Sequence, residues 1–161
     1  RLFFIEVMGR DSGCIALAAG IGAGAEYVML PERHTSIDAL IDVLETGAAH
    51  NKASSIVIVA EGEREGGAYV IANKVKEKFS HYDTRVTVLG HIQRGGNPTC
   101  FDRVLASRLG VAAIEHLLKG ISGKMVGILN NTVALTDFSE ATSRDFQLDK
   151  ELIRISAILG Q

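Results

Sequence analysis

Residues that could bind a phosphate group follow several apolar runs of this sequence. Arg10 lies between Gly9 and Gly13, just before a helical pattern that begins at Ser12. The free backbone N–H groups and the dipole at a helix start favour an anion, and arginine adds a fixed positive charge with several donors. A tight strand-to-helix turn with a solvated arginine is the alternative, and this motif alone does not decide between the two.

A second group of basic residues lies further along the chain. His91 and Arg94 flank a loop that ends in Gly95-Gly96, and Arg85 lies on the apolar run that leads into it. Arginine is suited to bidentate contact with phosphate, so this segment holds three groups that could bind a dianion. A basic turn whose charges are solvated is the alternative.

Glu61 directly follows the apolar run 55–60. A carboxylate there can accept hydrogen bonds from sugar hydroxyls, hold a metal ion or cap the strand end, and the sequence leaves this choice open. The chain has no Walker loop, no HExxH, no GxSxG and no kinase HRD or DFG motifs. It therefore shows a phosphate- and hydroxyl-binding half-site without a nucleotide cradle or a clear general base.

The elements that must position these residues alternate along the chain. Apolar runs predict strands over residues 2–7, 27–30, 55–60, 85–89 and 125–129. Helical patterns predict helices over residues 12–23, 37–47, 68–79, 99–119 and 149–159. This order predicts an α/β protein with a mainly parallel sheet in a Rossmann-like, three-layer α/β/α arrangement. Ligands bind such folds beyond the carboxyl ends of the strands, where the polar residues above fall.

Capping residues set the expected helix ends. Ser12 and Ser36 are predicted N-caps, and Gly47 is predicted to end the second helix. Thr99 with Asp102 three residues later predicts a capping box, with the shorter Asp in place of Glu.

Composition excludes several classes of protein. The 161 residues are 47% hydrophobic and 22% charged, as in a globular domain. With 17 Lys+Arg against 19 Asp+Glu, the net charge of -2 does not indicate a nucleic-acid partner. Cys14 and Cys100 are too few for a disulfide scaffold and fit a reducing cytoplasm. The longest small-apolar stretch, 14–25, is shorter than the about 20 residues that span a bilayer, so no membrane partner is expected.

The chain begins at Arg1, directly before a strand-like run. We therefore expect it to be a fragment of a longer protein. Ordinary N-terminal processing is the alternative.

The sequence resembles the bacterial-type ATP-dependent 6-phosphofructokinases. The resemblance is carried above all by TRVTVLGHIQRGG at 84–96, and also by 5–10, 59–62, 101–108 and 127–131. It covers essentially the whole chain and corresponds to the C-terminal half of such an enzyme. It implies a glycolytic kinase that transfers the terminal phosphoryl of ATP to the 1-hydroxyl of fructose 6-phosphate.

The resemblance also implies roles for individual residues. The implied substrate-binding residues are Arg1, Met8, Gly9, Arg10, Glu61, Arg85, His91 and Arg94. Arg10 is the implied catalytic residue, because it would neutralise charge on the phosphoryl group in flight. Glu61 would bind the sugar hydroxyls, and His91 and Arg94 would bind the 6-phosphate end.

Arg1 and Arg85 match two arginines that reach the 6-phosphate across a subunit interface. The resemblance therefore implies an oligomer, a homotetramer in this family, whose subunits complete one another's sites. The nucleotide loop, the magnesium-binding Asp and the general-base Asp of the family are expected upstream of Arg1. No metal ligand is therefore assigned in this chain, although Mg²⁺ is implied for the reaction.

An allosteric effector site is implied as well. Its residues would be Gly24, Ala25, Glu26, His50, Lys52, Ala53 and Ser54. Many bacterial members are more basic here, so a weak response to a nucleoside diphosphate or to phosphoenolpyruvate is expected.

The family also has two domains, and the resemblance implies where this chain divides. Residues 1–93 and about 145–161 would form the smaller, substrate-binding α/β domain. Residues 94–144 would belong to the larger, nucleotide-binding domain, most of which lies outside this chain.

Two alternatives stay open at this point. One is a diphosphate-dependent relative, although the loop 91–96 is closer to the short ATP-using enzymes. The other is a non-catalytic regulatory subunit that binds a sugar phosphate.

Overall fold

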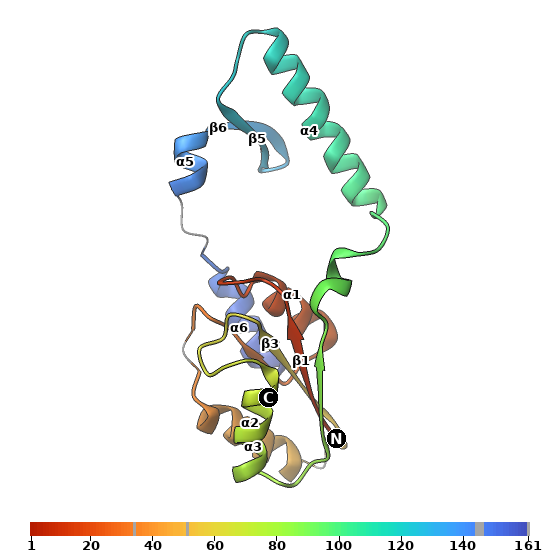
Figure 1. The fold of residues 1–161 in the computed structure, drawn as a ribbon, viewed down its shortest axis with the longest axis vertical. Coiled ribbons are helices and arrows are strands. Elements are labelled where there is room, and N and C mark those ends of the chain that lie inside the picture. Colours follow the sequence, from red (N-terminus) through yellow and green to blue (C-terminus); the bar gives the residue numbers. More distant parts are fainter. Residues whose placement is uncertain (34, 51, 144–146, 161) are drawn as a thin grey trace. The chain divides into compact units, whose positions relative to one another are not determined.

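The structure, a computed structural model, describes residues 1–33, 35–50, 52–143 and 147–160. It divides into two compact units (Figure 1). Unit 1 is Arg1–Gly95 with Gln147–Gln161, and unit 2 is Gly96–Phe146. This division lies close to the boundary expected after residue 93. The assignment of the two parts to a substrate-binding and a nucleotide-binding domain stays a prediction.

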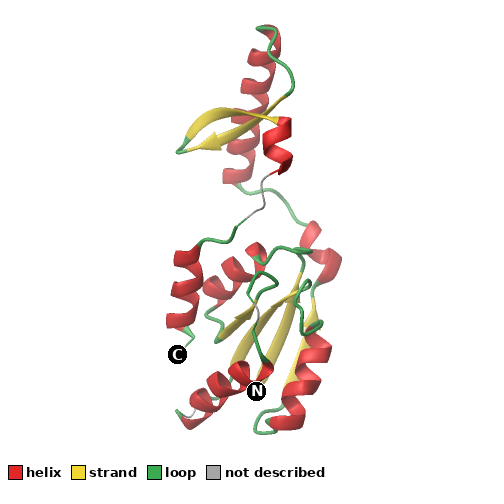
Figure 2. Cartoon of the chain, turned by 90° about the vertical axis from the view of Figure 1, so that its left-hand side faces the viewer, coloured by secondary structure: helices red, strands yellow, loops and turns green. Residues whose placement is uncertain are grey.

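Unit 1 is built on a four-stranded parallel sheet with the strand order β2-β3-β1-β4. Its strands are β1 (Leu2–Val7), β2 (Tyr27–Met29), β3 (Ser55–Ala60) and β4 (Thr84–Val88). Its α-helices are α1 (Cys14–Ala23), α2 (Ile37–Ala49), α3 (Ala68–Lys78) and α6 (Lys150–Leu159). Helices lie on both faces of the sheet (Figure 2), which confirms the predicted three-layer α/β/α fold.

Two apolar clusters hold the layers of unit 1 together. On one face Leu2 and Phe4 pack with residues of α2 and α3, such as Leu40 and Ile71. On the other face Ile58 and neighbouring side chains pack with α1 and α6. Burial of each such side chain contributes about 1.5–3 kcal/mol. Because strand side chains alternate between faces, the apolar run 56–60 supplies both clusters, as a covered parallel strand requires.

Unit 2 contains a long helix and an antiparallel hairpin. The helix α4 (Cys100–Leu118) packs against β5 (Lys124–Leu129) and β6 (Thr132–Asp137), and α5 (Phe138–Ser143) follows. Neither β6 nor α5 was expected from the sequence. Asn130 and Asn131 both have positive φ, 48° and 62°, which makes the two-residue turn that joins hairpin strands. The alternation of strands and helices therefore ends at β5.

The capping predictions have mixed outcomes. Thr99 and Asp102 form the capping box, and Ser36 accepts the Ala39 N–H, so both of these predictions are confirmed. The helix begins at Cys14 with Gly13 as its N-cap, so Ser12 is not the N-cap, although its Oγ accepts the Cys14 N–H at 3.3 Å. Helix α2 also continues past the buried Gly47 to Ala49.

In the part of the chain that the structure describes, no helix combines the length and the apolar character needed to cross a membrane.

Candidate functional site

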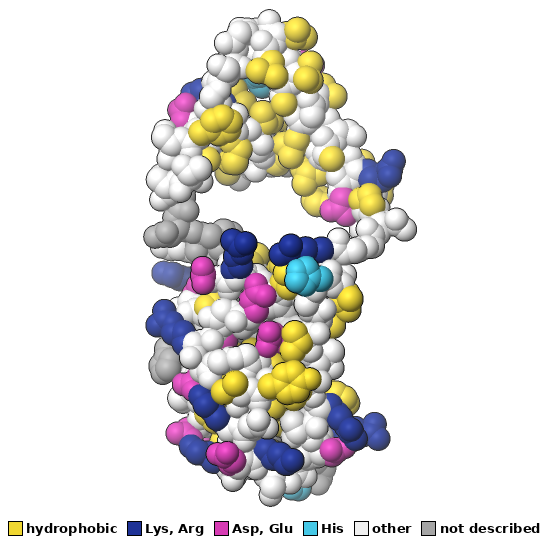
Figure 3. Space-filling model, viewed as in Figure 1, with side chains coloured by type: hydrophobic (Ala, Val, Ile, Leu, Met, Phe, Trp, Pro, Cys, Tyr) yellow, Lys and Arg dark blue, Asp and Glu magenta, His cyan; other side chains and the backbone are white. Residues whose placement is uncertain are grey.

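The carboxyl ends of three neighbouring strands bring most of the predicted substrate-binding residues together. Met8, Gly9 and Arg10 follow β1, and Glu61 follows β3, its parallel neighbour. The 3-10 helix η1 (Gly90–Arg94), which carries His91 and Arg94, follows β4 on the other side of β1. Figure 3 shows basic, acidic and histidine side chains close together on this end of unit 1. We call Met8–Arg10, Glu61 and η1 the carboxyl-edge cluster.

Hydrogen bonds tie the turn after β1 to both neighbouring segments. The backbone N–H groups of Gly9 and Arg10 both donate to Oε1 of Glu61, at 3.1 and 2.6 Å. The N–H of Met8 donates to Oε1 of Gln93 in η1, at 2.9 Å. The turn is thus fixed from two sides by side chains that lie far away in the sequence.

The backbone of this turn has an unusual conformation. Arg10 has a φ of 51°, a left-handed value that is uncommon for residues other than glycine. The lack of a side chain at Gly62 lets the Arg10 backbone lie close to it, because a Cβ at Gly62 would lie 2.1 Å from the Arg10 carbonyl oxygen. Strained residues of this kind often occur at functional sites, where the surrounding structure holds them in place. Here the two bonds to Glu61 hold Arg10, and its side chain is exposed.

The bonds at Glu61 also set its ionisation. The N–H donors of Arg10 and Gly9 lower the pKa of Glu61 below its ordinary value, and the positive charges of Arg10 and Arg94 act in the same direction. Desolvation opposes this shift of the pKa and is outweighed. Glu61 is therefore an ionised acceptor that organises the turn.

Glu61→Gln is expected to flatten the dependence of the unfolding free energy on pH in acid. Folding lowers the pKa of Glu61 from 4.5, so the ionised carboxylate stabilises the folded chain above that pH. This contribution is lost as the pH falls through the lowered folded-state pKa. Urea unfolding at a series of pH values below neutral measures it, with the exposed Glu45→Gln as the matched control. Identical pH profiles for the two variants would contradict the role of Glu61.

Two predicted substrate residues lie at the opposite, amino edge of the sheet. Arg1 directly precedes β1, and Arg85 is the second residue of β4, opposite Phe3. The Arg85 guanidinium pairs with Asp83 at 2.8 Å. Because the strands separate the two edges, one chain does not bring Arg1 and Arg85 to the carboxyl-edge cluster. A shared phosphate would need a second subunit.

The predicted effector residues also lie at the amino edge, before β2 and β3. Lys52 Nζ is 3.8 Å from Oε1 of Glu26, whose Oε2 accepts the Ile56 N–H at 2.5 Å. The charges of Glu26 and Lys52 therefore already face partners within the chain. The other predicted effector residues are Gly24, Ala25, His50, Ala53 and Ser54, of which Ala25 is buried.

Sequence reasoning assigned no role to two residues that position the site. Gln93 holds the Met8 N–H, and Glu32, after β2, accepts the Gly13 N–H at 2.8 Å. Both residues lie in segments that follow strands of the parallel sheet, where ligand-binding residues are expected. That position indicates the segment, but it does not show which side chain holds a backbone N–H. Among the described residues, no group of His, Cys, Asp or Glu side chains is arranged to hold a metal ion.

Gln93→Leu is expected to speed amide hydrogen exchange at Met8 by about 10-fold, the effect of losing one hydrogen bond. Leucine has a similar size but offers no acceptor to the Met8 N–H. Gln93→Glu keeps an acceptor oxygen and is expected to keep the protection. Hydrogen exchange followed by NMR on the whole chain measures both variants. Unchanged exchange in Gln93→Leu would show that Gln93 does not fix the turn.

Comparison with known proteins places this arrangement in a family. The sequence model of the family described as Phosphofructokinase matches residues 1–117. The chain is 46% identical to ATP-dependent 6-phosphofructokinase 2 of Bacteroides thetaiotaomicron, over 96% of this chain and 48% of that protein. It is 49% identical to ATP-dependent 6-phosphofructokinase 1 of Thermus thermophilus, over 99% of this chain and 49% of that protein.

The fold matches a solved structure as well. Phosphofructokinase from Saccharomyces cerevisiae superposes with a TM-score of 0.80 and 30% identity, over 88% of this chain and 20% of that chain. The chain spans about half the length of the curated relatives that it matches. The family match over most of the sequence and the identity to these relatives show that the chain belongs to the phosphofructokinase family.

Proposed function

We propose that this chain supplies the sugar-phosphate half-site of an ATP-dependent 6-phosphofructokinase. The enzyme would transfer the terminal phosphoryl group of ATP to the 1-hydroxyl of fructose 6-phosphate. The observation that carries the proposal is the turn 8–10, which Glu61 and Gln93 fix at the sheet edge where η1 presents its basic residues. The relatives with 46% and 49% identity are named for the same reaction, which supports it.

Each residue of the carboxyl-edge cluster would have a defined task. Arg10 would place its positive charge beside the phosphoryl group during transfer, when negative charge must be stabilised. His91 and Arg94 are exposed on η1 and would bind the 6-phosphate of the sugar. Fixing these groups before the substrate arrives lowers the entropic cost of reaching the reactive geometry.

The remaining parts of the enzyme would lie outside this chain. We infer that it corresponds to the C-terminal half, as the resemblance of its motifs implies. Its coverage of 48–49% of the relatives supports a piece of about half their length. The residues that bind ATP and Mg²⁺ and the general base would then come from the other half, and unit 2 would complete the nucleotide-binding domain. Arg1 and Arg85 would serve the site of a neighbouring subunit in a homotetramer. The complete enzyme would act in glycolysis in the cytoplasm.

Allosteric control is proposed to be weak. A nucleoside diphosphate or phosphoenolpyruvate needs several charge-assisted contacts. At the proposed effector site, Lys52 faces Glu26 at 3.8 Å and His50 is the remaining basic residue of the set.

A coupled assay of the full-length protein with fructose 6-phosphate tests the proposed function. ATP and diphosphate are compared as donors, and the isolated chain is assayed in parallel and is expected to be inactive. Turnover with ATP supports the proposal, whereas turnover with diphosphate alone would identify a diphosphate-dependent relative. Binding of fructose 6-phosphate without turnover by either donor would indicate a regulatory subunit.

A further inference from the structure

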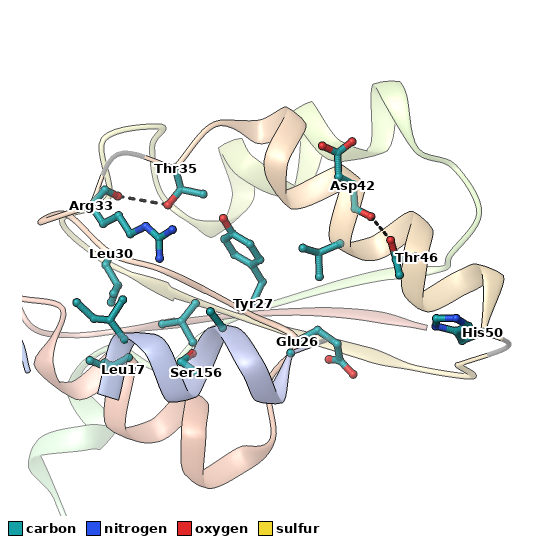
Figure 4. A pocket seen from close by; sticks show the side chains of 15 residues that line it. Leu17, Glu26, Tyr27, Leu30, Arg33, Thr35, Asp42, Thr46, His50 and Ser156 are labelled. Carbon is teal, nitrogen blue, oxygen red and sulfur yellow. Dashed lines mark hydrogen bonds between the residues drawn. The ribbon is translucent and has the colours of Figure 1, made fainter. Parts of the chain in front are cut away.

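Unit 1 contains a cavity that takes no part in the carboxyl-edge cluster. It has a volume of about 590 Å³ and lies beside the edge strand β2, between α2 and α6 (Figure 4). None of the cluster residues lines it. Glu26 and His50 of the proposed effector site lie at one end. The volume is within the range of about 300–1,000 Å³ that is usual for pockets that bind small molecules.

The walls of the cavity are mainly apolar and come from separate elements. Ile153 and Ala157 lie one helical turn apart on α6, and Val43 lies on α2. Leu17, Val28 and Leu30 also belong to the apolar lining. An empty apolar space leaves such side chains without contacts on one side, so a ligand with an apolar body would gain dispersion and hydrophobic energy there.

A close backbone contact holds α6 in position beside the cavity. A Cβ on Gly160, directly after α6, would lie 2.1 Å from the Glu26 carbonyl oxygen. The end of the helix therefore rests on the backbone just before β2, where any side chain would force it away. This contact helps to position α6, which also packs against α1 through Ile153.

One cation faces this apolar space. The Arg33 guanidinium points into the cavity, beside the hydroxyl end of Tyr27 (Figure 4). Within the described part of the chain, no ion pair or hydrogen bond of this guanidinium is found. The Asp42 carboxylate points away from the cavity, and Glu26 is held by Ile56 and Lys52. Among the described residues, the positive charge that a ligand in the cavity can pair with is therefore that of Arg33, whose side chain is exposed. His50 lies at the opposite end of the cavity (Figure 4).

We propose that this cavity binds a small amphipathic carboxylate. Its apolar body would lie between α2 and α6, and its single carboxylate would pair with Arg33, with the Tyr27 hydroxyl as a second donor. A polyphosphate fits this site poorly, because burying several charges beside apolar walls with one cation is unfavourable. The inference goes beyond the proposed function and does not depend on phosphoryl transfer.

Titration calorimetry on the whole chain with 4-phenylbutyrate tests the proposal, and 4-phenylbutan-1-ol serves as the neutral probe of equal shape. Arg33→Gln is expected to weaken binding of the carboxylate by about 10-fold or more, the effect of losing a charge-assisted contact, and to leave the alcohol unchanged. Arg64→Gln removes another exposed arginine of unit 1 and is the charge-matched control. Ala157→Leu fills the cavity and is expected to weaken both probes.

The outcomes separate the proposal from its competitors. Absence of binding by both probes, or equal binding of acid and alcohol, would overturn it. Loss of 4-phenylbutyrate binding in Arg64→Gln as well would show a general effect of charge and would also overturn the proposal. Displacement of 4-phenylbutyrate by a nucleoside diphosphate would assign the probe to the effector residues instead. If circular dichroism shows that Arg33→Gln does not fold, the test rests on Ala157→Leu. Unchanged binding of both probes by that variant would overturn the proposal.

Discussion

Arg10→Ala in the full-length enzyme is expected to lower kcat by about 10²-fold or more, while KM changes little. The side chain of Arg10 is exposed, and its backbone is left-handed. The Arg10 N–H donates to Oε1 of Glu61 at 2.6 Å, which fixes the turn that carries the charge. Charge on the phosphoryl group develops during transfer, and a group that stabilises it acts mainly in the transition state. Steady-state kinetics with varied fructose 6-phosphate measures both constants.

Two variants serve as controls for Arg10. Arg85→Ala is expected to raise KM chiefly, because Arg85 would contact the 6-phosphate of a neighbouring subunit's substrate in the ground state. Arg64→Ala removes an exposed arginine without an assigned role and is expected to change neither constant. An intact kcat with only a raised KM in Arg10→Ala would show that Arg10 binds substrate and does not act in the transfer step.

The isolated chain is expected to self-associate through α4. Among the residues of this helix only Ala112 is buried, and Leu118 is 84% exposed and Phe101 73% exposed. Further exposed apolar side chains of α4 are Val104, Val111, Ile114 and Leu117. Covering each is worth about 1.5–3 kcal/mol, so together they rival the net stability of a domain. Apolar patches of this size mark interfaces or aggregation sites, and in the full-length enzyme we expect the other half of the protein to cover α4.

Sedimentation velocity over a range of concentrations measures this association. The double variant Val111→Glu/Leu118→Glu is expected to shift the isolated chain to monomer and to impair folding of the full-length enzyme. Arg103→Glu/Lys119→Glu, which changes exposed charged residues of the same segment, is the control. A chain that stays monomeric at every concentration would contradict the view that α4 lacks its partner surface.

The carboxyl-edge cluster follows from the sequence because strands that alternate with helices are expected to be parallel. The mainly apolar runs that form β1 and β3 indicate a covered sheet, so Arg10 and Glu61 are expected to follow strands at one edge. The same logic would have placed Arg1 at the other edge, since it precedes β1.

Other features depend on contacts that no local pattern encodes. The bond from the Met8 N–H to Gln93 joins residues 85 positions apart, and it exists because β1 and β4 are neighbours in the sheet. The order of strands in the sheet is not specified by the alternation of strands and helices along the chain. The hairpin of unit 2 was missed for a different reason, because Asn130-Asn131 is a local turn signal whose left-handed conformation was not considered.

The central claim is that the carboxyl-edge cluster binds the sugar phosphate, and an NMR titration of the chain with fructose 6-phosphate tests it most directly. The monomeric Val111→Glu/Leu118→Glu variant is used, and backbone amide shifts are mapped on unit 1. The account predicts weak binding, with the largest shifts at Gly9, Arg10 and the residues of η1, lost in Arg94→Ala and kept in Arg64→Ala. Shifts confined to the amino edge around Arg85 and Lys52, or binding that Arg94→Ala leaves unchanged, would contradict it.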